Sequence, residues 1–249
     1  MICQIVLIYS RAHISWNGLH CPLNQGIGAA CAISLAQAGA ALCLVLREPQ
    51  GDAPPNLATV NVIRDLGATA EFVYCDLNDL DSVKGVFQKA LDAMGGRIDV
   101  LVNCAGIQRR SPSLDFSETD WDDVRPPYAP RLVLYFSYSG KTTLSFNLRT
   151  PAPTSCVYPD THLMLQVLDV NLKSVWLLSQ AAGRHMVPRR QGKIINFCSL
   201  LTFQGGFTVP AYAAAKGALG QLTKALSNEW SQHNVQVNGI CPGYIATDM

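Results

Sequence analysis

"GIGAACAISLAQAGAALCLVLRE" (residues 26–48) joins a glycine-containing turn to a helix-length run of small residues and then to a fully apolar strand. The alternation continues to Gly106, where "AEFVYCDL" and "RIDVLVNCAG" are separated by an amphipathic stretch of helix length. It returns in "KIINFCSLL", "AYAAAKGALGQLTKALSNEW" and "VQVNGICPG". Apolar strands that alternate with such helices are typical of a parallel sheet covered on both faces. We therefore predict one doubly wound, Rossmann-like α/β domain over residues 1–249.

Composition narrows the function classes. The 249 residues carry a formal net charge of +1, and the scattered lysines and arginines argue against nucleic acid or a membrane surface as partner and favour a small-molecule substrate. The opening "MICQIVLIYS" lacks a basic leader and is too short to span a bilayer, so we interpret it as a buried strand and expect a cytoplasmic protein. The nine cysteines show no Cys-x-x-Cys pair, so we expect reduced thiols and no metal site.

Residues 125–167 interrupt the pattern with six of the fourteen prolines and a single acidic residue. Structureless connections of this length are uncommon inside a compact domain. Joining Val124 to Leu168 restores an apolar stripe with helical spacing that runs on to Trp176. We interpret the segment as an insertion that splits one helix, from a retained intron or an error in gene prediction; a functional surface loop is the alternative. Its "SGKTT" has Tyr135 where a P-loop needs glycine, which argues against a triphosphate site.

Polar residues follow several of the predicted strands. Tyr212 and Lys216 lie four residues apart on one face of a predicted helix, and Ser199 ends the strand before it. Asp76, "NCAG" (103–106) and "CPGYIAT" (241–247) close three other strands. Because the carboxyl ends of parallel strands meet at one edge of the sheet, we expect a site there.

The ordered elements GIG, DL, NxAG, VN, Ser, YxxxK and PGxxxT together resemble the short-chain dehydrogenase/reductase family over residues 26–124 and 168–249. The resemblance implies an NAD(P)-dependent oxidoreductase that acts on CH–OH groups. It implies a homo-oligomer, although the insertion would split the helix that commonly packs against a partner. It implies a catalytic tetrad of Asn171, Ser199, Tyr212 and Lys216. The implied cofactor site comprises Tyr212 and Lys216 together with Gly26, Ile27, Gly28, Arg47, Asp76, Leu77, Asn103, Ala105, Gly106, Pro242, Gly243 and Thr247.

The physical chemistry of the tyrosine supports such a role. A phenol with a pKa near 10 needs about 4 kcal/mol of stabilisation of its anion to reach a pKa near 7, and a nearby ammonium at Lys216 favours the anion. We expect Tyr212 to take the hydroxyl proton as hydride leaves the substrate carbon. Ser199 would bond the same oxygen, and Asn171 would position a water.

Cofactor and substrate leave alternatives open. Arg47 suits a 2′-phosphate and Glu48 a free ribose hydroxyl, so both NADP and NAD fit, with a preference for NAD. The segment "NCAGIQRRSPSLDFSETDWDDV" most resembles sugar-acid dehydrogenases, whose substrates include 2-deoxy-D-gluconate. Arg109 and Arg110 lie just past a predicted strand end, and we expect Arg109 to bind a carboxylate of the substrate and Gln204 to contact sugar hydroxyls. A 3-oxoacyl reductase of the same family is a further alternative.

The chain departs from the family in three places. Cys21-Pro22 replaces the Thr-Gly that begins the phosphate turn; proline removes an N–H donor, and we expect cofactor affinity to fall about tenfold to hundredfold. "HISWNGLH" makes a poor central strand, so we predict "CQIVLIY" as the first strand, followed by a long loop. The insertion is the second departure, and an end at Met249 without the family's substrate cover is the third. The competing hypothesis is a catalytically defective or mis-spliced product that retains weak cofactor binding.

Overall fold

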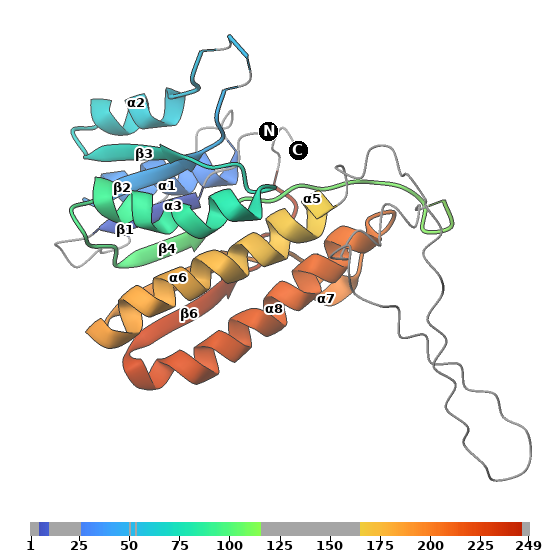
Figure 1. The fold of residues 1–249 in the computed structure, drawn as a ribbon. Coiled ribbons are helices and arrows are strands. Elements are labelled where there is room, and N and C mark those ends of the chain that lie inside the picture. The colour runs from blue at the N-terminus through green and yellow to red at the C-terminus, as the bar shows by residue number, and fades with distance from the viewer. Residues whose placement is uncertain (1–4, 10–25, 50, 53, 116–164, 246–249) are drawn as a thin grey trace, which may run out of the picture.

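A six-stranded sheet forms the centre of the molecule (Figure 1). The computed structural model describes residues 5–9, 26–49, 51–52, 54–115 and 165–245. The strand order is β3-β2-β1-β4-β5-β6. The strands are β1 (Ile5–Tyr9), β2 (Ala41–Leu46), β3 (Ala70–Tyr74), β4 (Val100–Asn103), β5 (Gly192–Phe197) and β6 (Val235–Ile240).

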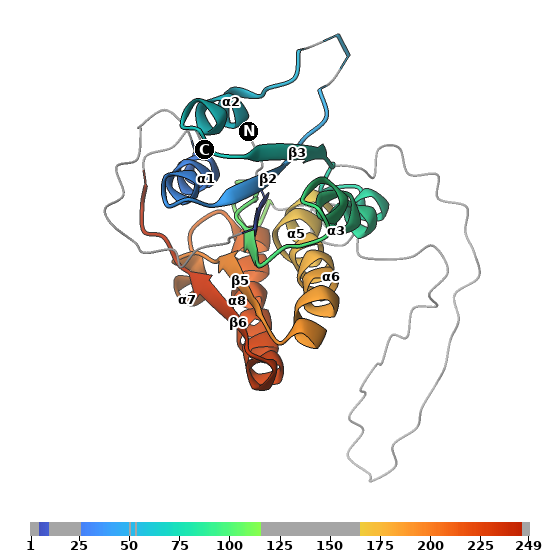
Figure 2. The ribbon, with the colours of Figure 1, turned by 90° about the vertical axis from the view of Figure 1, so that its left-hand side faces the viewer.

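Helices cover both faces of this sheet, as Figure 2 shows from a second direction. One face carries α1 (Ile27–Gln37) and α2 (Ala58–Asp65), and the other carries α3 (Leu80–Ala93), α6 (Ser174–Arg189) and α8 (Pro210–Trp230). Shorter elements are α5 (Leu165–Leu168), a π-helical turn (Asp169–Lys173), α7 (Leu201–Gln204) and a 3₁₀ turn (Ser231–His233). None of the described helices is long and apolar enough to cross a bilayer. The predicted doubly wound α/β fold is confirmed.

Strand β2 is apolar throughout because both of its faces are buried. Leu42 and Leu44 pack in the cluster beneath α1 and α2, whereas Cys43 and Val45 pack on the opposite side beneath α3. A strand with alternate residues in two cores has no polar face, which explains the continuous apolar run in its sequence.

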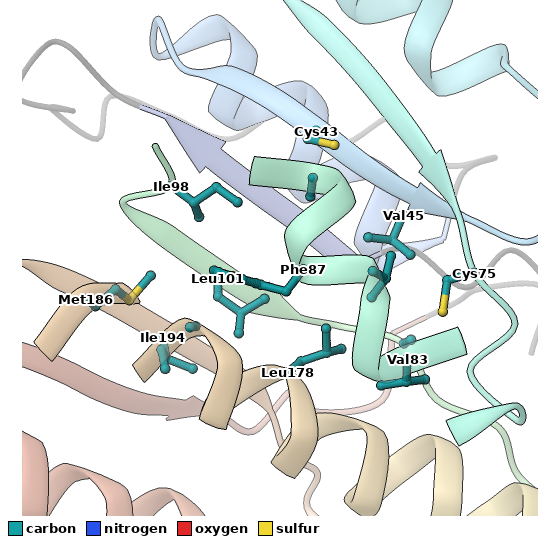
Figure 3. Packing of buried hydrophobic residues seen from close by; sticks show 14 of the residues in the cluster. Cys43, Val45, Cys75, Val83, Phe87, Ile98, Leu101, Leu178, Met186 and Ile194 are labelled. Atoms are coloured by element: carbon teal, nitrogen blue, oxygen red, sulfur yellow. The ribbon is translucent and has the colours of Figure 1, made fainter. Parts of the chain in front are cut away.

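The larger core lies between the sheet and α3, α6 and α8. In Figure 3 the side chains of Phe87 from α3, Leu101 from β4 and Leu178 from α6 converge on one another. Leu101 and Leu178 are fully buried. Burial of a side chain of this size contributes about 1.5–3 kcal/mol, so this core holds the strand ends that carry the site in fixed positions.

The first strand has the predicted place and an unexpected direction. β1 lies between β2 and β4 but runs antiparallel to both, with Ile5 opposite Val45 on one side and Asn103 on the other. The other strand pairs are parallel. The prediction of a wholly parallel sheet is therefore wrong at β1. A short run of apolar residues is compatible with either strand direction, so the sequence carries no signal that distinguishes them.

The helix predicted to resume at Leu168 already begins at Leu165, inside the segment predicted as an insertion. The rest of that segment, the helix start before it and Pro22 lie outside the described residues. A π-helical turn follows, in which Val170 and Asn171 are buried although the predicted apolar stripe did not include them. Trp176, which that stripe placed in the core, is 37% exposed. A π-turn adds one residue to the helical period, so a regular helical spacing fails beyond it.

Candidate active site

A cavity of about 920 Å³ opens at the carboxyl ends of β4, β5 and β6. Three of the predicted catalytic residues, Ser199, Tyr212 and Lys216, contribute to its lining. Ser199 follows the end of β5, and the other two lie one turn apart on α8. The fold therefore brings together the residues that the strand ends and the helical spacing predicted at one edge.

The three side chains contact one another. The Lys216 Nζ lies over the Tyr212 ring, 5.6 Å from its centroid, and donates a hydrogen bond to the Phe197 carbonyl at 2.7 Å. The Ser199 side chain interacts with Tyr212 and acts to lower the pKa of its phenol. Ser199 Oγ also accepts from the Leu201 amide at 3.2 Å, which holds the hydroxyl in place.

Burial controls the protonation of both titratable groups. It lowers the pKa of Lys216 from its usual 10.5 to about 8, because only 3% of this residue is exposed. It raises the pKa of Tyr212, while the hydrogen bond from Ser199 acts in the opposite direction. The sequence predicts that Lys216 lowers the pKa of Tyr212; in this pocket removal from water outweighs the other influences, and the ammonium is directed at a carbonyl.

Asn171, the fourth predicted catalytic residue, lies behind the cavity lining. It sits in the π-helical turn and is fully buried, and its Nδ2 donates to the Ile107 carbonyl at 2.8 Å and to the Val167 carbonyl at 2.7 Å. Its Oδ1 has no hydrogen-bond partner among the described residues. A Cβ built on Gly106 would lie 2.7 Å from this Oδ1 and 3.8 Å from the Lys216 Nζ. Gly106 therefore allows Asn171 and Lys216 to approach the same point.

Replacing Gly106 with alanine is expected to lower the stability by about 1–3 kcal/mol, because the new methyl group must displace Asn171 from its two hydrogen bonds. Chemical denaturation measures this change. The matched control is Gly85→Ala in α3, where a Cβ meets no atom within 4 Å. That variant should gain about 0.5–1 kcal/mol from helix propensity. Equal effects at both positions would contradict the close approach at Gly106.

The glycine turn faces the same cavity. Gly26, Ile27 and Gly28 line it at the start of α1, where the Gly26 carbonyl accepts from the Ala29 and Ala30 amides. No side chain caps this helix start. A Cβ built on Gly26 would meet no protein atom within 4 Å, so packing within the described chain does not require glycine there. An open helix N-terminus beside a cavity fits a pyrophosphate.

The other predicted cofactor residues divide into two groups. Ala105, Gly106, Pro242 and Gly243 line the main cavity, whereas Arg47, Asp76 and Leu77 line a separate hollow of about 60 Å³ beyond the ends of β2 and β3. Thr247 lies outside the described residues.

Asn103 lines neither hollow. It is buried at the end of β4, where its Nδ2 donates to Asn196 Oδ1 at 2.9 Å. Asn196 Nδ2 in turn donates to Thr223 Oγ1 at 3.0 Å, so a polar chain joins β4, β5 and α8 behind the site. Sequence reasoning missed Asn196 and Thr223, because neither residue belongs to a recognised motif.

The predicted substrate residues do not line the main cavity. Arg109 and Gln204 lie outside the lining of the main cavity, whereas Gln108 and Arg110 belong to it. With the Gln108 amide oxygen turned toward Arg110, it accepts from Nε at 3.1 Å and from Nη2 at 3.0 Å. Arg110 is the neighbour of the predicted Arg109, and the sequence alone contains no signal that distinguishes the two arginines.

Known proteins resemble this chain over most of its length. It is 34% identical over 227 residues to 2-dehydro-3-deoxy-D-gluconate 5-dehydrogenase of Escherichia coli, covering 90% of this chain and 70% of that protein. It is 32% identical over 228 residues to gluconate 5-dehydrogenase of Gluconobacter oxydans, covering 91% and 70%. A gluconate 5-dehydrogenase from Burkholderia cenocepacia, solved with NADP and tartrate, matches with a TM-score of 0.60 at 29% identity over 87% of this chain and 67% of that one.

The profile of the short chain dehydrogenase family matches residues 23–126 and 154–249. The unmatched residues 127–153 fall within the segment that we interpret as an insertion, and that interpretation stays a prediction. The matched parts contain the glycine turn, the strand ends and the Tyr212–Lys216 pair. The predicted resemblance is thereby confirmed: the chain belongs to the short-chain dehydrogenase family of NAD(P)-dependent oxidoreductases.

Proposed function

We propose that this chain catalyses hydride transfer between NAD(P) and a secondary hydroxyl group of a sugar acid. The observation that carries the proposal is the shared cavity: Ser199, Tyr212 and Lys216 line it together with the open N-terminus of α1. A volume of about 920 Å³ lies within the usual range for sites that bury cofactors and small substrates.

The side chains present divide the chemistry between them. Ser199 and Tyr212 bond the same substrate oxygen, and the phenolate of Tyr212 accepts its proton. A nicotinamide cofactor held at the glycine turn (Gly26–Gly28) would supply the acceptor for the substrate hydride. Lys216, buried beside the ring, stabilises the phenolate when it is charged. Asn171 holds its buried, unpartnered Oδ1 near Lys216, where a water could carry the proton outward.

A sugar acid is the proposed substrate because of a cation in the cavity and the names of the relatives. Arg110 lines the cavity, and Gln108 fixes its guanidinium. The relatives from Escherichia coli, Gluconobacter and Burkholderia are named for gluconate or deoxygluconate substrates, and the last was solved with tartrate, which is also a hydroxy acid. A fixed guanidinium with further N–H donors suits a carboxylate.

Replacing Arg110 with leucine is expected to raise KM for 2-deoxy-D-gluconate about tenfold to hundredfold, the usual worth of a hydrogen bond to a charged group. Steady-state kinetics with this acid and with uncharged 2-deoxyglucose measures the effect. KM for the neutral sugar should not change. Arg109→Leu is the matched control, because its side chain lies outside the cavity lining. Equal losses for both variants would exclude a specific contact at Arg110.

The choice between the two nicotinamide cofactors depends on Arg47. Its Nη2 lies 3.5 Å from Asp76 Oδ2, and its side chain is 52% exposed at the end of β2. The Burkholderia neighbour holds NADP, so we propose that Arg47 contacts a 2′-phosphate, in place of the preference for NAD that the sequence suggests. Arg47→Ala should raise KM for NADP about tenfold and leave KM for NAD unchanged. A parallel rise for both cofactors would refute this contact.

The proposed activity is tested by incubating the purified chain with NAD or NADP and a substrate panel, while the absorbance of reduced nicotinamide is recorded. We expect turnover with 2-deoxy-D-gluconate or gluconate. Faster reduction of a 3-oxoacyl thioester would favour that alternative substrate class.

The antiparallel β1 favours the defective-product hypothesis. Cofactor binding without turnover on any substrate of the panel would establish that hypothesis instead.

A further inference from the structure

Cys198 and Cys241 directly follow the paired strands β5 and β6. Phe197 lies opposite Ile240 in this parallel ladder, so the next residue on each strand brings the two cysteines side by side. Neighbouring strands lie about 4.8 Å apart, and cysteines can be bridged when their Cα atoms are about 4.4–6.8 Å apart. The register therefore places the two cysteines within bridging range.

Their side chains also point the same way. Both pack against the small cluster that contains Val175 and Leu219. A Cβ built on Gly239 would lie 3.0 Å from the Cys198 Sγ, so this sulfur leans over β6, the strand that leads to Cys241. The two thiols are close enough for Cys241 to influence the pKa of Cys198, which burial raises. The two side chains therefore lie on the same side of the paired strands.

A third cysteine, Cys104, is not aligned with Cys198 in the sheet. Cys104 lines the same cavity as Cys198, but Asn103 is paired with Asn196 in the ladder of β4 and β5. The residue after Asn103 is therefore level with Phe197, one position short of Cys198. Cys104 shares the surroundings of the pair and lacks its alignment, which makes it a matched control.

We propose that Cys198 and Cys241 are an oxidation site, which forms a reversible disulfide with a small disulfide such as oxidised glutathione and thereby lowers turnover. The thiolate of Cys241 attacks one sulfur of oxidised glutathione, forms a mixed disulfide and releases one glutathione thiolate. Cys198 then loses its proton to solvent and attacks the Cys241 sulfur, which expels the second glutathione. Two protein thiols are oxidised to one disulfide, and the small disulfide is reduced to two thiols.

The order of attack follows from exposure. Cys241 is half-buried, whereas Cys198 is 6% exposed and burial raises the pKa of its thiol. A thiol that is harder to ionise and to reach is the poorer first nucleophile. Cys198 nevertheless suits the second step, because its target sulfur then lies beside it.

The bond would distort the active site. A disulfide fixes the separation of the two Cβ atoms at about 3.8 Å and the torsion about the S–S bond, a constraint that the strand ends of the reduced protein do not carry. Ser199 follows one cysteine and Pro242 the other, and both line the catalytic cavity. If the strand ends adjust to this constraint by about 1 Å, catalysis can slow about a hundredfold. The expected loss of turnover rests on the proposed function, whereas formation of the bond does not.

The test treats the purified full chain with oxidised glutathione, digests it without reduction and maps the peptides by mass spectrometry. We expect one peptide that joins Cys198 to Cys241 and disappears with dithiothreitol. Cys104→Ser should keep this link, and Cys241→Ser should abolish it. NADP titration of the oxidised protein should show about tenfold weaker binding, and turnover should fall about tenfold to hundredfold and recover on reduction.

Each outcome decides a separate claim. A link to Cys104, or a mixed disulfide at Cys241 that never resolves, would overturn the site. A complete link with unchanged NADP binding and turnover would overturn its effect on the active site. Absence of turnover in the reduced protein, with the link still forming, would refute the dehydrogenase proposal and leave the disulfide standing.

Discussion

Replacing Tyr212 with phenylalanine is expected to lower kcat for sugar-acid oxidation about a thousandfold, the usual contribution of a positioned general base. The phenol hydroxyl is lost, while the ring beneath the Lys216 ammonium remains, so NADP affinity should stay within about twofold. Stopped-flow or steady-state kinetics and a cofactor titration measure the two effects separately.

The pH profile gives an independent reading of the same residue. Burial raises the pKa of Tyr212, so the phenolate is scarce near neutrality and wild-type oxidation should accelerate as the pH rises. The phenylalanine variant should lose this dependence. Tyr74→Phe is the matched control, since Tyr74 lies on β3 outside the cavity and packs edge-on against Phe72. A Tyr212→Phe variant with full turnover would remove the tyrosine from the mechanism.

The fold and the position of the site follow from patterns that the sequence displays directly. β2 is apolar on both faces because helices cover both, and that run of residues is enough to predict a doubly wound sheet. The four-residue spacing of Tyr212 and Lys216 predicts their shared face, since a helix has one turn per 3.6 residues. Ser199 could be added because a strand end has a known edge in such a sheet.

Other features depend on contacts that no local pattern encodes. The antiparallel direction of β1 could not be predicted, because a short apolar sequence is compatible with either strand direction. The π-helical turn around Asn171 breaks the helical period where a buried amide is held by two backbone carbonyls. The choice of Arg110 over Arg109 depends on which side chain the loop turns inward. The raised pKa of Tyr212 reflects burial in the whole pocket and not its spacing to Lys216.

Replacing Lys216 with methionine is expected to change how strongly the stability of the fold depends on pH. Burial lowers the pKa of Lys216 from 10.5 to about 8, which corresponds to about 3 kcal/mol of destabilisation of the charged form in the folded protein. Below pH 8 the lysine is protonated in both states, so the folded state bears this full cost. Between pH 8 and 10.5 the unfolded chain binds the proton and the folded chain does not, so stability rises with pH.

Methionine carries no proton in either state. The unfolding free energy of the wild type minus that of the variant should therefore increase by about 3 kcal/mol from pH 7 to pH 10.5. The variant also leaves the Phe197 carbonyl without its donor, which costs about 1–3 kcal/mol. This cost is the same at every pH, so it does not change how the difference in unfolding free energy depends on pH. Urea denaturation across this pH range measures how the difference in unfolding free energy changes with pH. Cys43 and Cys75, whose pKa values burial raises and which do not interact with Lys216, destabilise both proteins alike as the pH rises and cancel in the difference.

Lys224→Met is the matched control, because Lys224 is exposed on the same helix. For this variant the difference in unfolding free energy from the wild type should not change with pH. A flat difference for Lys216 as well would mean that its ammonium is solvated. We expect Lys216→Met to lose turnover as well, because the charge that is costly to bury is the one that we propose to stabilise the phenolate formed beside it. A chain that retained turnover after losing this lysine would have to stabilise the phenolate by other means, and no other described side chain that lines the cavity places a cation over the Tyr212 ring.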